Sequence, residues 1–205
     1  MTLKKIFRAL RRPFIRVLIF FTYCLGCLCY DKAYLQGPCF DRSHFTIGWQ
    51  WILKYWFGQK ILRKNAHIPW PVPPYTAVAN PANIHFDPSD MRIFHTIGTY
   101  FQGIGAPVTI GKGTMIAPGV GLITANHRFD DVHAHQTGKP ITIGAKSWLG
   151  MNAVILPGVC LGPETIVGAG AVVTHSFPEG HCVLAGNPAR KIRDIGEEAT
   201  PNATP

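Results

Sequence analysis

Charged side chains are scarce in this 205-residue sequence, at 15% of the residues, and acids are scarcer than bases, with 11 Asp and Glu against 20 Lys and Arg. So little charge argues against a coiled coil or a helical bundle, and an apolar content of 47% argues against a disordered chain. The 21 glycines follow no Gly-X-Y period, which excludes collagen. The length suits one domain with an extension.

The basic excess is confined to one end of the chain. Residues 1–64 contain 12 of the Lys and Arg residues and two acids, whereas residues 65–205 contain 8 bases and 9 acids. A nucleic-acid-binding domain would carry positive charge on its main body, and this main body is neutral. The sequence therefore predicts no nucleic-acid partner and a separate basic extension over residues 1–74.

The start of the extension has the pattern of an amphipathic helix, with apolar residues every three or four positions and basic residues on the opposite face. Pro13 marks a kink or a new start. The apolar positions are Leu3, Ile6, Phe7, Leu10, Phe14, Val17, Leu18 and Phe21, and the basic ones are Lys4, Lys5, Arg8, Arg11 and Arg12.

Two features of the extension suit a membrane surface. Residues 17–30 form an uncharged run that is shorter than the roughly 20 residues of a membrane-spanning helix. Residues 49–57 hold five aromatic side chains close to lysines, a composition typical of the lipid headgroup boundary. We expect residues 1–64 to hold the protein at the cytoplasmic face of a membrane, peripherally or by a shallow anchor. A membrane span over residues 14–30, a packed core helix and a cleaved segment remain open alternatives.

From residue 104 onward the sequence repeats with a period of six. The repeated position is aliphatic each time, and Gly or Ala follows it at seven of the ten positions. The ten aliphatic residues are Ile104, Ile110, Ile116, Leu122, Ile143, Leu149, Ile155, Leu161, Val167 and Val173. Six residues match neither a helix nor a simple alternating strand, but they match short strands joined by tight corners, three to a coil. We expect this mainly β domain to span residues 75–193, with looser coils at Val78, Ile84, Ile93 and Ile97, and residues 194–205 to form a flexible tail.

The repeat is interrupted once, between Leu122 and Ile143, which lie 21 residues apart. Because 21 is not a multiple of six, the sequence predicts a loop over residues 127–140 that leaves one corner of the coil. Polar loops on rigid scaffolds often carry binding and catalytic groups. His127 stands where this loop begins and is the first candidate for chemistry.

Six motifs in a fixed order resemble the hexapeptide-repeat acyltransferases, most closely the maltose, galactoside and nodulation-factor O-acetyltransferases, and suggest a member that serves polysaccharide biosynthesis. The resemblance covers roughly residues 78–193. The motifs are ITANH at 123–127, KPITIG at 139–144, SWLG at 147–150, ILPGV at 155–159, GAGAVVT at 168–174 and GNPAR at 186–190.

The resemblance implies a left-handed parallel β-helix and a homotrimer that binds acetyl-coenzyme A (acetyl-CoA) between neighbouring subunits. It makes His127 the general base that takes a proton from a sugar hydroxyl for direct acetyl transfer, a role that suits an imidazole, which is largely neutral at physiological pH. Asn126 and Asp130 would contact the acceptor. The coenzyme would meet Trp148, Gly150, Ala169, Thr174, Arg190 and Lys191, and a backbone N–H near Gly150 would stabilise the oxyanion. His175 stands where the family often has lysine, which weakens a phosphate contact there.

Two other functions remain open. The loop histidines His127, His133 and His135 could bind zinc, as in prism-shaped carbonic anhydrases, or the coil could serve as a non-catalytic binding scaffold. Cys24 and Cys27 have no second cysteine pair beside them, so the sequence predicts no structural metal site. For the acetyltransferase, the membrane-directed extension favours an acceptor made at the inner face of the membrane, such as a capsular polysaccharide, a lipopolysaccharide or a lipid-linked glycan.

Overall fold

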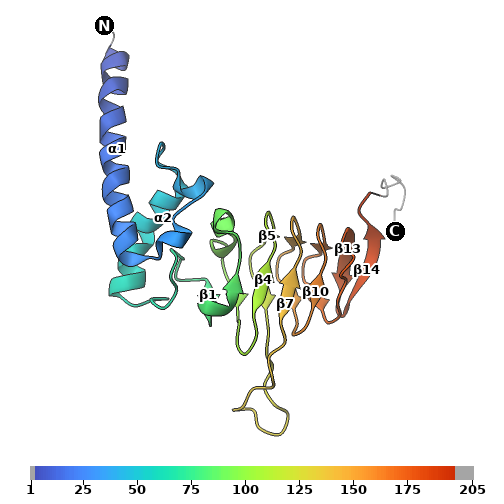
Figure 1. Ribbon diagram of the computed structural model, residues 1–205. Coiled ribbons are helices and arrows are strands. Elements are labelled where there is room, and N and C mark those ends of the chain that lie inside the picture. The colour runs from blue at the N-terminus through green and yellow to red at the C-terminus, as the bar shows by residue number, and fades with distance from the viewer. Residues whose placement is uncertain (1–2, 197–205) are drawn as a thin grey trace. The chain divides into compact units, whose positions relative to one another are not determined.

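The computed structural model describes residues 3–196, with side chains from residue 13 onward, and divides the chain into two compact units after Thr76 (Figure 1). The sequence placed this boundary after residue 74. The predicted basic face of the first helix, from Lys4 to Arg12, lies outside the described side chains. Most of the predicted C-terminal tail, residues 197–205, also lies outside the described residues.

The N-terminal unit is helical. It consists of α1 (Leu3–Cys29), two short 3₁₀ turns, η1 (Lys32–Tyr34) and η2 (Pro38–Phe40), then α2 (Ile47–Trp56) and the π-helical turn η3 (Phe57–Ile61). Pro13 lies inside α1, so the helix does not begin anew at this residue.

Close packing of α1 on α2 forms the core of this unit. Gly26 makes the approach possible, because a Cβ atom at this position would lie 2.8 Å from Cδ1 of Ile52. Trp49, Trp51 and Tyr55 on α2 are buried. The prediction that residues 49–57 form an aromatic membrane boundary is therefore wrong for these three side chains, since they lie in the interior of the helical unit, where Trp49 contacts Tyr23 of α1.

Among residues 77–196, the strands form three sheets that the chain visits in turn (Figure 1). Sheet 1 contains β1 (Ala77–Val78), β3 (Tyr100–Phe101), β6 (Gly121–Leu122), β9 (Val154–Ile155) and β12 (Val172–Val173). Sheet 2 contains β2 (Ile84–His85), β4 (Val108–Ile110), β7 (Ile141–Ile143) and β10 (Cys160–Leu161). Sheet 3 contains β5 (Met115–Ile116), β8 (Trp148–Leu149), β11 (Ile166–Val167), β13 (Cys182–Gly186) and β14 (Ala189–Asp194).

All strand pairs are parallel except β13 with β14. In the regular part, partners in adjacent coils are 18 residues apart, as in Thr142 with Cys160 and Trp148 with Ile166. Three six-residue repeats, each with one short strand, therefore make one coil. The fold is mainly β, with hexapeptide repeats and parallel sheets, and it is consistent with the β-helix expected from the sequence.

The ten aliphatic residues of the six-residue repeat line the core of the coil. Nine of the ten are buried, and Ile104 at the start is half-buried. Full burial of one such side chain stabilises the fold by about 1.5–3 kcal/mol, which explains why aliphatic residues recur at these positions. Glycine beside the aliphatic residue allows adjacent coils to touch, because a Cβ at Gly162 would lie 2.2 Å from the carbonyl oxygen of Pro178.

The first coils are irregular, as expected. Val78, Ile84 and Ile93 are buried, but Ile97 is 63% exposed and does not belong to the core. Two 3₁₀ segments, η4 (Pro81–Asn83) and η5 (Pro88–Phe94), interrupt these coils, and η5 occupies the place in the chain where a strand of sheet 3 would fall. At the other end, β14 includes Asp194, the first residue of the predicted tail, and pairs it with Cys182.

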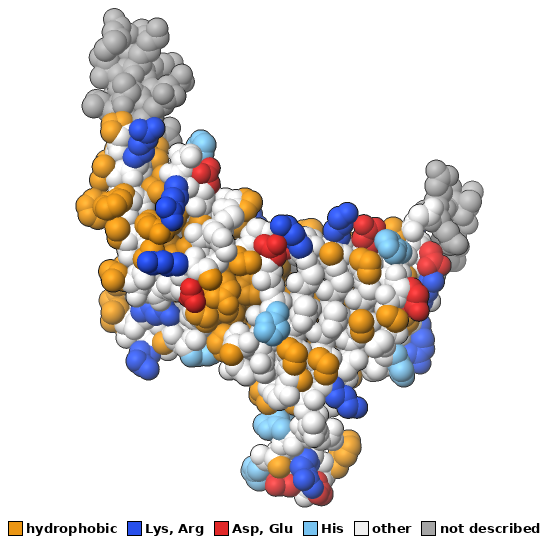
Figure 2. All heavy atoms as spheres, in the orientation of Figure 1, with side chains coloured by type: hydrophobic (Ala, Val, Ile, Leu, Met, Phe, Trp, Pro, Cys, Tyr) orange, Lys and Arg blue, Asp and Glu red, His pale blue; other side chains and the backbone are white. Residues whose placement is uncertain are grey.

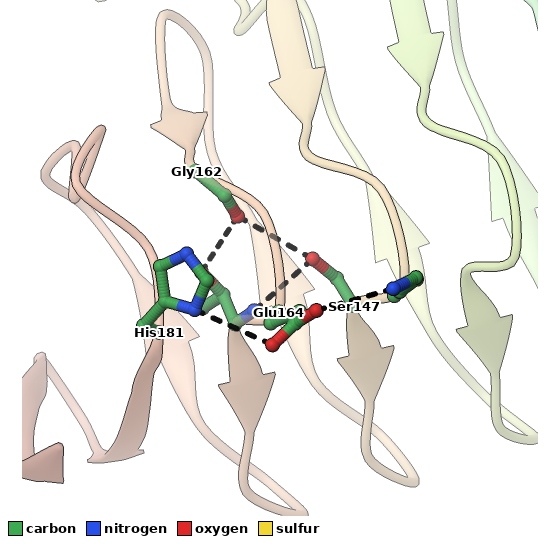
Figure 3. Close-up of polar contacts among 6 residues, drawn as sticks. Ser147, Gly162, Glu164 and His181 are labelled. Atoms are coloured by element: carbon green, nitrogen blue, oxygen red, sulfur yellow. Dashed lines mark hydrogen bonds and ion pairs between the residues drawn. The ribbon is translucent and has the colours of Figure 1, made fainter. Parts of the chain in front are cut away.

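Ion pairs link the coils along the corner between sheets 2 and 3 (Figure 3). Glu164 lies between Lys146 at 3.4 Å and the Nδ1 atom of His181 at 3.3 Å, each from a different coil. Beneath them, the Ser147 hydroxyl accepts the Thr165 N–H at 3.2 Å. Lys146, Glu164 and His181 all have positive φ angles, between 47° and 56°, so the corner repeats one left-handed turn in each coil.

Candidate functional site

The loop that interrupts the repeat is a paired arm (Figure 1). Strand partners on either side of it, such as Val108 and Ile141, are 33 residues apart instead of 18, so it adds 15 residues to one coil. The Arg128 N–H donates to the Ala134 carbonyl and the Gln136 N–H to the Asn126 carbonyl, both at 2.8 Å. These bonds hold the two halves of the arm together as it leaves the corner between sheets 1 and 2.

His127 lies at the base of this arm and is exposed. It forms an antiparallel bridge with His135, and the two imidazole rings lie 4.5 Å apart with an angle of 32° between their planes. The neighbouring Asn126 is also exposed. The ring of His127 can therefore be reached from solvent, as a base that accepts a proton from a bound hydroxyl must be.

Asp130 does not contact His127. Its two carboxylate oxygens accept hydrogen bonds from the guanidinium of Arg128, two residues earlier. These bonds lower the pKa of the Asp130 carboxyl below its usual value. Asp130 is thus a charged partner of Arg128 on the exposed arm, and its contact with an acceptor stays a prediction.

A buried glutamine that the sequence analysis missed anchors the chain just before His127. The side-chain oxygen of Gln102 accepts the backbone N–H groups of Thr124 and Ala125, both at 2.8 Å. The Thr124 hydroxyl also donates to the Ile104 carbonyl at 2.9 Å. Gln102 is only 7% exposed, and it fixes the backbone two residues ahead of the candidate base.

On sheet 3, Trp148 presents an indole ring to solvent. It is 51% exposed on β8, between the neighbouring strand positions Met115 and Ile166. Met115 is exposed and Ile166 is half-buried, so the outer face of this sheet carries an apolar row. An exposed indole beside apolar side chains is a suitable surface for part of a coenzyme or for a second subunit.

At the end of β8, the predicted role of Gly150 needs correction. Its N–H donates to the Val167 carbonyl at 2.8 Å and is therefore already used between coils. A Cβ at Gly150 would lie 2.7 Å from the Ala169 nitrogen, so glycine is required here by the stacking of the next coil. The N–H of Ala169, one coil further, has no hydrogen-bond partner within the described residues and is the better candidate to meet a ligand.

The other predicted coenzyme contacts follow β12 or lie on β14. Thr174 follows β12, and its hydroxyl contacts Nδ1 of His175 at 2.7 Å. Lys191 on β14 forms an ion pair with Asp194, and Arg190 donates to the carbonyl of its neighbour Ala189 at 3.0 Å. Gly150, two residues after Trp148 on β8, meets Ala169 at the corner between sheets 3 and 1, and contacts of Thr174, Arg190 and Lys191 with a coenzyme stay a prediction.

The bacterial transferase hexapeptide family, defined by six repeats, matches residues 140–175. A Dictyostelium discoideum protein named for a proposed acetyltransferase activity is 46% identical over 116 residues, which cover 55% of this chain and 58% of that one. The galactoside O-acetyltransferase of Escherichia coli is 42% identical over 97 residues, covering 44% of this chain and 45% of that one.

A solved structure of a hexapeptide-repeat-containing acetyltransferase from Vibrio cholerae is 30% identical, with a TM-score of 0.41, and covers 58% of this chain and 70% of that one. The chain belongs to the hexapeptide-repeat acyltransferases. A second structure of the V. cholerae protein, with acetyl-coenzyme A bound, is 32% identical, covers 47% of this chain and 57% of that one, and has a TM-score of 0.42. This chain spans about half the length of the curated relatives it matches.

In this hexapeptide-repeat acyltransferase, the candidate base and the candidate coenzyme surface lie at different corners of the coil. The arm with His127 follows β6 and leaves between sheets 1 and 2, whereas Gly150 and Ala169 follow strands of sheet 3 and precede strands of sheet 1. Within one chain, these groups therefore lie at opposite ends of the strands of sheet 1.

The loop histidines of this family member do not form the ligand set that the zinc alternative needs. Within the described part of the chain, no group of three or more His, Cys, Asp or Glu side chains could hold a metal ion. His127 and His135 lie side by side, but a catalytic zinc site commonly uses three protein ligands.

Proposed function

We propose that this chain is an acetyl-CoA-dependent O-acetyltransferase that transfers an acetyl group to a sugar hydroxyl, with His127 as general base. The observation that carries the proposal is the exposed imidazole at the base of the one arm that interrupts the described coil, anchored through Gln102. The identity of 42% to a galactoside O-acetyltransferase and of 32% to an enzyme solved with acetyl-coenzyme A supports the two substrates.

In the proposed reaction, Nε2 or Nδ1 of His127 accepts the proton of the acceptor hydroxyl as the hydroxyl oxygen forms a bond to the acyl carbon. The donor supplies an activated thioester, whose C–S bond breaks as the new ester bond forms. His127 then returns its proton to the sulfur, so the base is regenerated without an acyl-enzyme. The Ala169 N–H, which has no partner within the described residues, is placed to donate to a carbonyl oxygen of the donor.

We infer that the active unit is a homotrimer in which each site joins two copies. The arm of one chain would face the corner between sheets 3 and 1 of the next, which brings His127 to Trp148 and Ala169 across the contact. The exposed apolar row on sheet 3, with Met115 and Trp148, supports such a contact, because it would otherwise remain in water. Asn126 and Asp130 then face the acceptor from the arm.

The acceptor we favour is a glycan assembled at the cytoplasmic face of the membrane, such as a capsular polysaccharide, a lipopolysaccharide or a lipid-linked repeat unit. Apolar side chains remain exposed along α1, among them Phe14, Val17 and Phe21 (Figure 2). Within the described residues, no helix combines the length and the apolar character that crossing a membrane requires. We propose that α1 lies on the membrane surface with this face toward the lipid.

The assay for the reaction is release of free thiol from acetyl-CoA in the presence of a panel of sugars. We expect His127→Ala to lower kcat by about 10²–10⁴ without changing the KM for acetyl-CoA, because proton transfer is lost and the coenzyme surface is intact. His133→Ala, on the same exposed arm, is the control and should keep wild-type kcat. A His127→Ala enzyme with wild-type kcat would exclude the proposed mechanism.

A mixed-subunit experiment tests whether the site is shared. Trp148→Ala should raise the KM for acetyl-CoA, and mixing the Trp148→Ala and His127→Ala chains during refolding should restore part of the activity. Some contacts in the mixture join an intact His127 to an intact Trp148 from another copy. If both groups came from one chain, every site in the mixture would remain defective.

Membrane attachment is tested by sedimentation with anionic lipid vesicles. The double substitution Phe14→Gln and Phe21→Gln should release the protein into the supernatant. Phe129→Gln is the matched control, since Phe129 is 99% exposed but lies on the arm of the β unit. Equal sedimentation of wild type and the double variant would contradict the role of α1.

A further inference from the structure

The helical N-terminal unit contains an apolar cavity of about 330 Å³ that the reaction above does not use. Tyr55, Leu62, Val72 and Tyr75 form much of its wall, and Gly58 leaves one side open. The volume lies at the lower end of the range of about 300–1,000 Å³ that is usual for small-molecule sites.

The wall of this cavity is fixed by hydrogen bonds. Gln59, which is buried, donates from Nε2 to the Trp70 carbonyl at 2.9 Å and accepts the Val72 N–H on Oε1 at 3.2 Å. The adjacent Lys60 donates to the carbonyls of Ala66 and Ile68, both at 3.0 Å. Both side chains come from the π-helical turn η3, a type of turn that often occurs at functional sites. The cavity is therefore preformed, and the polar atoms of Gln59 are already satisfied within the protein.

The residues that line the apolar cavity include positive charge and no acid. Lys54 and Lys64 are both among the lining residues. The sequence has no Asp or Glu between Asp41 and Asp87, so the whole segment that forms the cavity lacks carboxylates. Phe57 and Ile61, on the π-helical turn η3, are exposed and add an apolar surface outside the cavity. An apolar interior, two lysines and no carboxylate complement a ligand that has one apolar chain and an anionic head.

We propose that this cavity binds the apolar chain of a lipid phosphate, with the phosphate group on Lys54 and Lys64. The inference rests on the proposed function, and it specifies the acceptor as a glycan carried on a single-chain lipid phosphate. The cavity would take the part of the carrier next to the phosphate, while the remainder of the chain stays with the membrane. Binding here needs neither acetyl-CoA nor His127.

The test is calorimetric titration of the full-length protein with dodecyl phosphate below its micellar concentration. We expect saturable binding of dodecyl phosphate, and binding at least about tenfold weaker for dodecyltrimethylammonium, which has the same chain and the opposite charge. Inorganic phosphate alone should give no measurable heat. If the cationic amphiphile bound as tightly as the phosphate, the lysines would have no selective role and the proposal would be overturned.

Gly58→Leu fills the cavity without crowding the backbone, because a Cβ at Gly58 would meet no other atom within 4 Å. We expect this variant to bind dodecyl phosphate at least about tenfold more weakly, since leucine takes the volume that the apolar chain needs. The pair Lys54→Gln and Lys64→Gln should weaken binding similarly, whereas Lys32→Gln, an exposed lysine that does not line the cavity, should not.

Two readouts separate this inference from the acetyltransferase proposal. Gly58→Leu should keep the wild-type thermal midpoint and wild-type thiol release with soluble sugars, and lose only lipid phosphate binding. Unchanged dodecyl phosphate affinity in Gly58→Leu would refute the cavity, whatever the outcome with His127→Ala. Loss of thiol release in His127→Ala alone would leave the binding result unaffected.

Discussion

Replacing Gln102 by methionine tests how the arm that carries His127 is anchored. Methionine has nearly the same length and volume as glutamine but offers no strong acceptor, so packing is largely kept while the N–H groups of Thr124 and Ala125 lose their partner. Both partners are buried, at 0% and 3% exposure. A buried donor without an acceptor costs about 1–3 kcal/mol, so the two together lower the free energy of unfolding by about 2–6 kcal/mol.

The same change should lower kcat. Gln102 fixes residues 124 and 125, and His127 follows two residues later, so the backbone that leads to the ring loses one of its anchors. The hydrogen bond from the Thr124 hydroxyl to the Ile104 carbonyl and the bridge to His135 remain. A misplacement of about 1 Å can cost about 10² in rate, and we expect a fall of about 10–100-fold in kcat with little change in the KM for acetyl-CoA.

Urea unfolding and the thiol-release assay measure these two effects. Gln36→Met is the control, because Gln36 is exposed and donates one hydrogen bond to the Ala33 carbonyl, and its unfolding midpoint should stay close to that of the wild type. Wild-type stability together with wild-type kcat in Gln102→Met would show that neither hydrogen bond matters to the arm.

Two further predictions concern the coil itself. Gly162→Ala should lower the thermal midpoint more than Gly170→Ala does. A Cβ at Gly162 would lie 2.2 Å from the Pro178 carbonyl oxygen, whereas a Cβ at Gly170 meets no atom within 4 Å and brings only the strain of a φ of +70°. Equal midpoints of the two variants would contradict the stacking of the coils. Hydrogen bonds from Ser89 and then from Lys112 lower the pKa of Asp87 to about 2. At pH values above the usual aspartate pKa of about 3.9, the ionised carboxylate therefore stabilises the fold. This contribution to the free energy of unfolding disappears as the pH falls through about 2. Asp87→Asn should therefore have a lower urea midpoint than the wild type at pH 7, and this difference should shrink as the pH approaches 2; a difference as large near pH 2 as at pH 7 would refute this assignment.

The sequence predicted the coil well because its period is a direct consequence of burial. Every sixth residue points inward, so the aliphatic positions in the sequence are the core positions in the structure, and Ile104 at the first coil is the one that is not fully buried. The arm was also predictable, because an insertion breaks the period. These features depend on residues close together in the sequence or on a repeated rule.

The remaining features depend on partners that the period does not encode. Gln102 lies 22 residues before Thr124, and no motif marks it as the acceptor of that N–H. Trp49 and Trp51 appear as a surface aromatic cluster until Tyr23 of α1 is placed against Trp49 and Phe40 against both rings. The N–H of Gly150 appears available until Val167 is placed one coil further, where its carbonyl accepts that bond. For the tryptophans and for Gly150, a group was assigned to a membrane or a ligand although the protein itself supplies the partner, whereas Gln102 was not singled out.

The way the coil is filled also bears on how many copies make a site. Aliphatic side chains occupy its interior, so substrates must bind on the outside, at the corners or on the sheet faces. The two corners needed for the proposed reaction differ, since His127 leaves between sheets 1 and 2 and Ala169 lies between sheets 3 and 1. A head-to-tail contact between these unlike corners generates a ring when its rotation closes. We propose that three copies close this ring, as in the homotrimer inferred above, and that each new subunit completes the site begun by its neighbour.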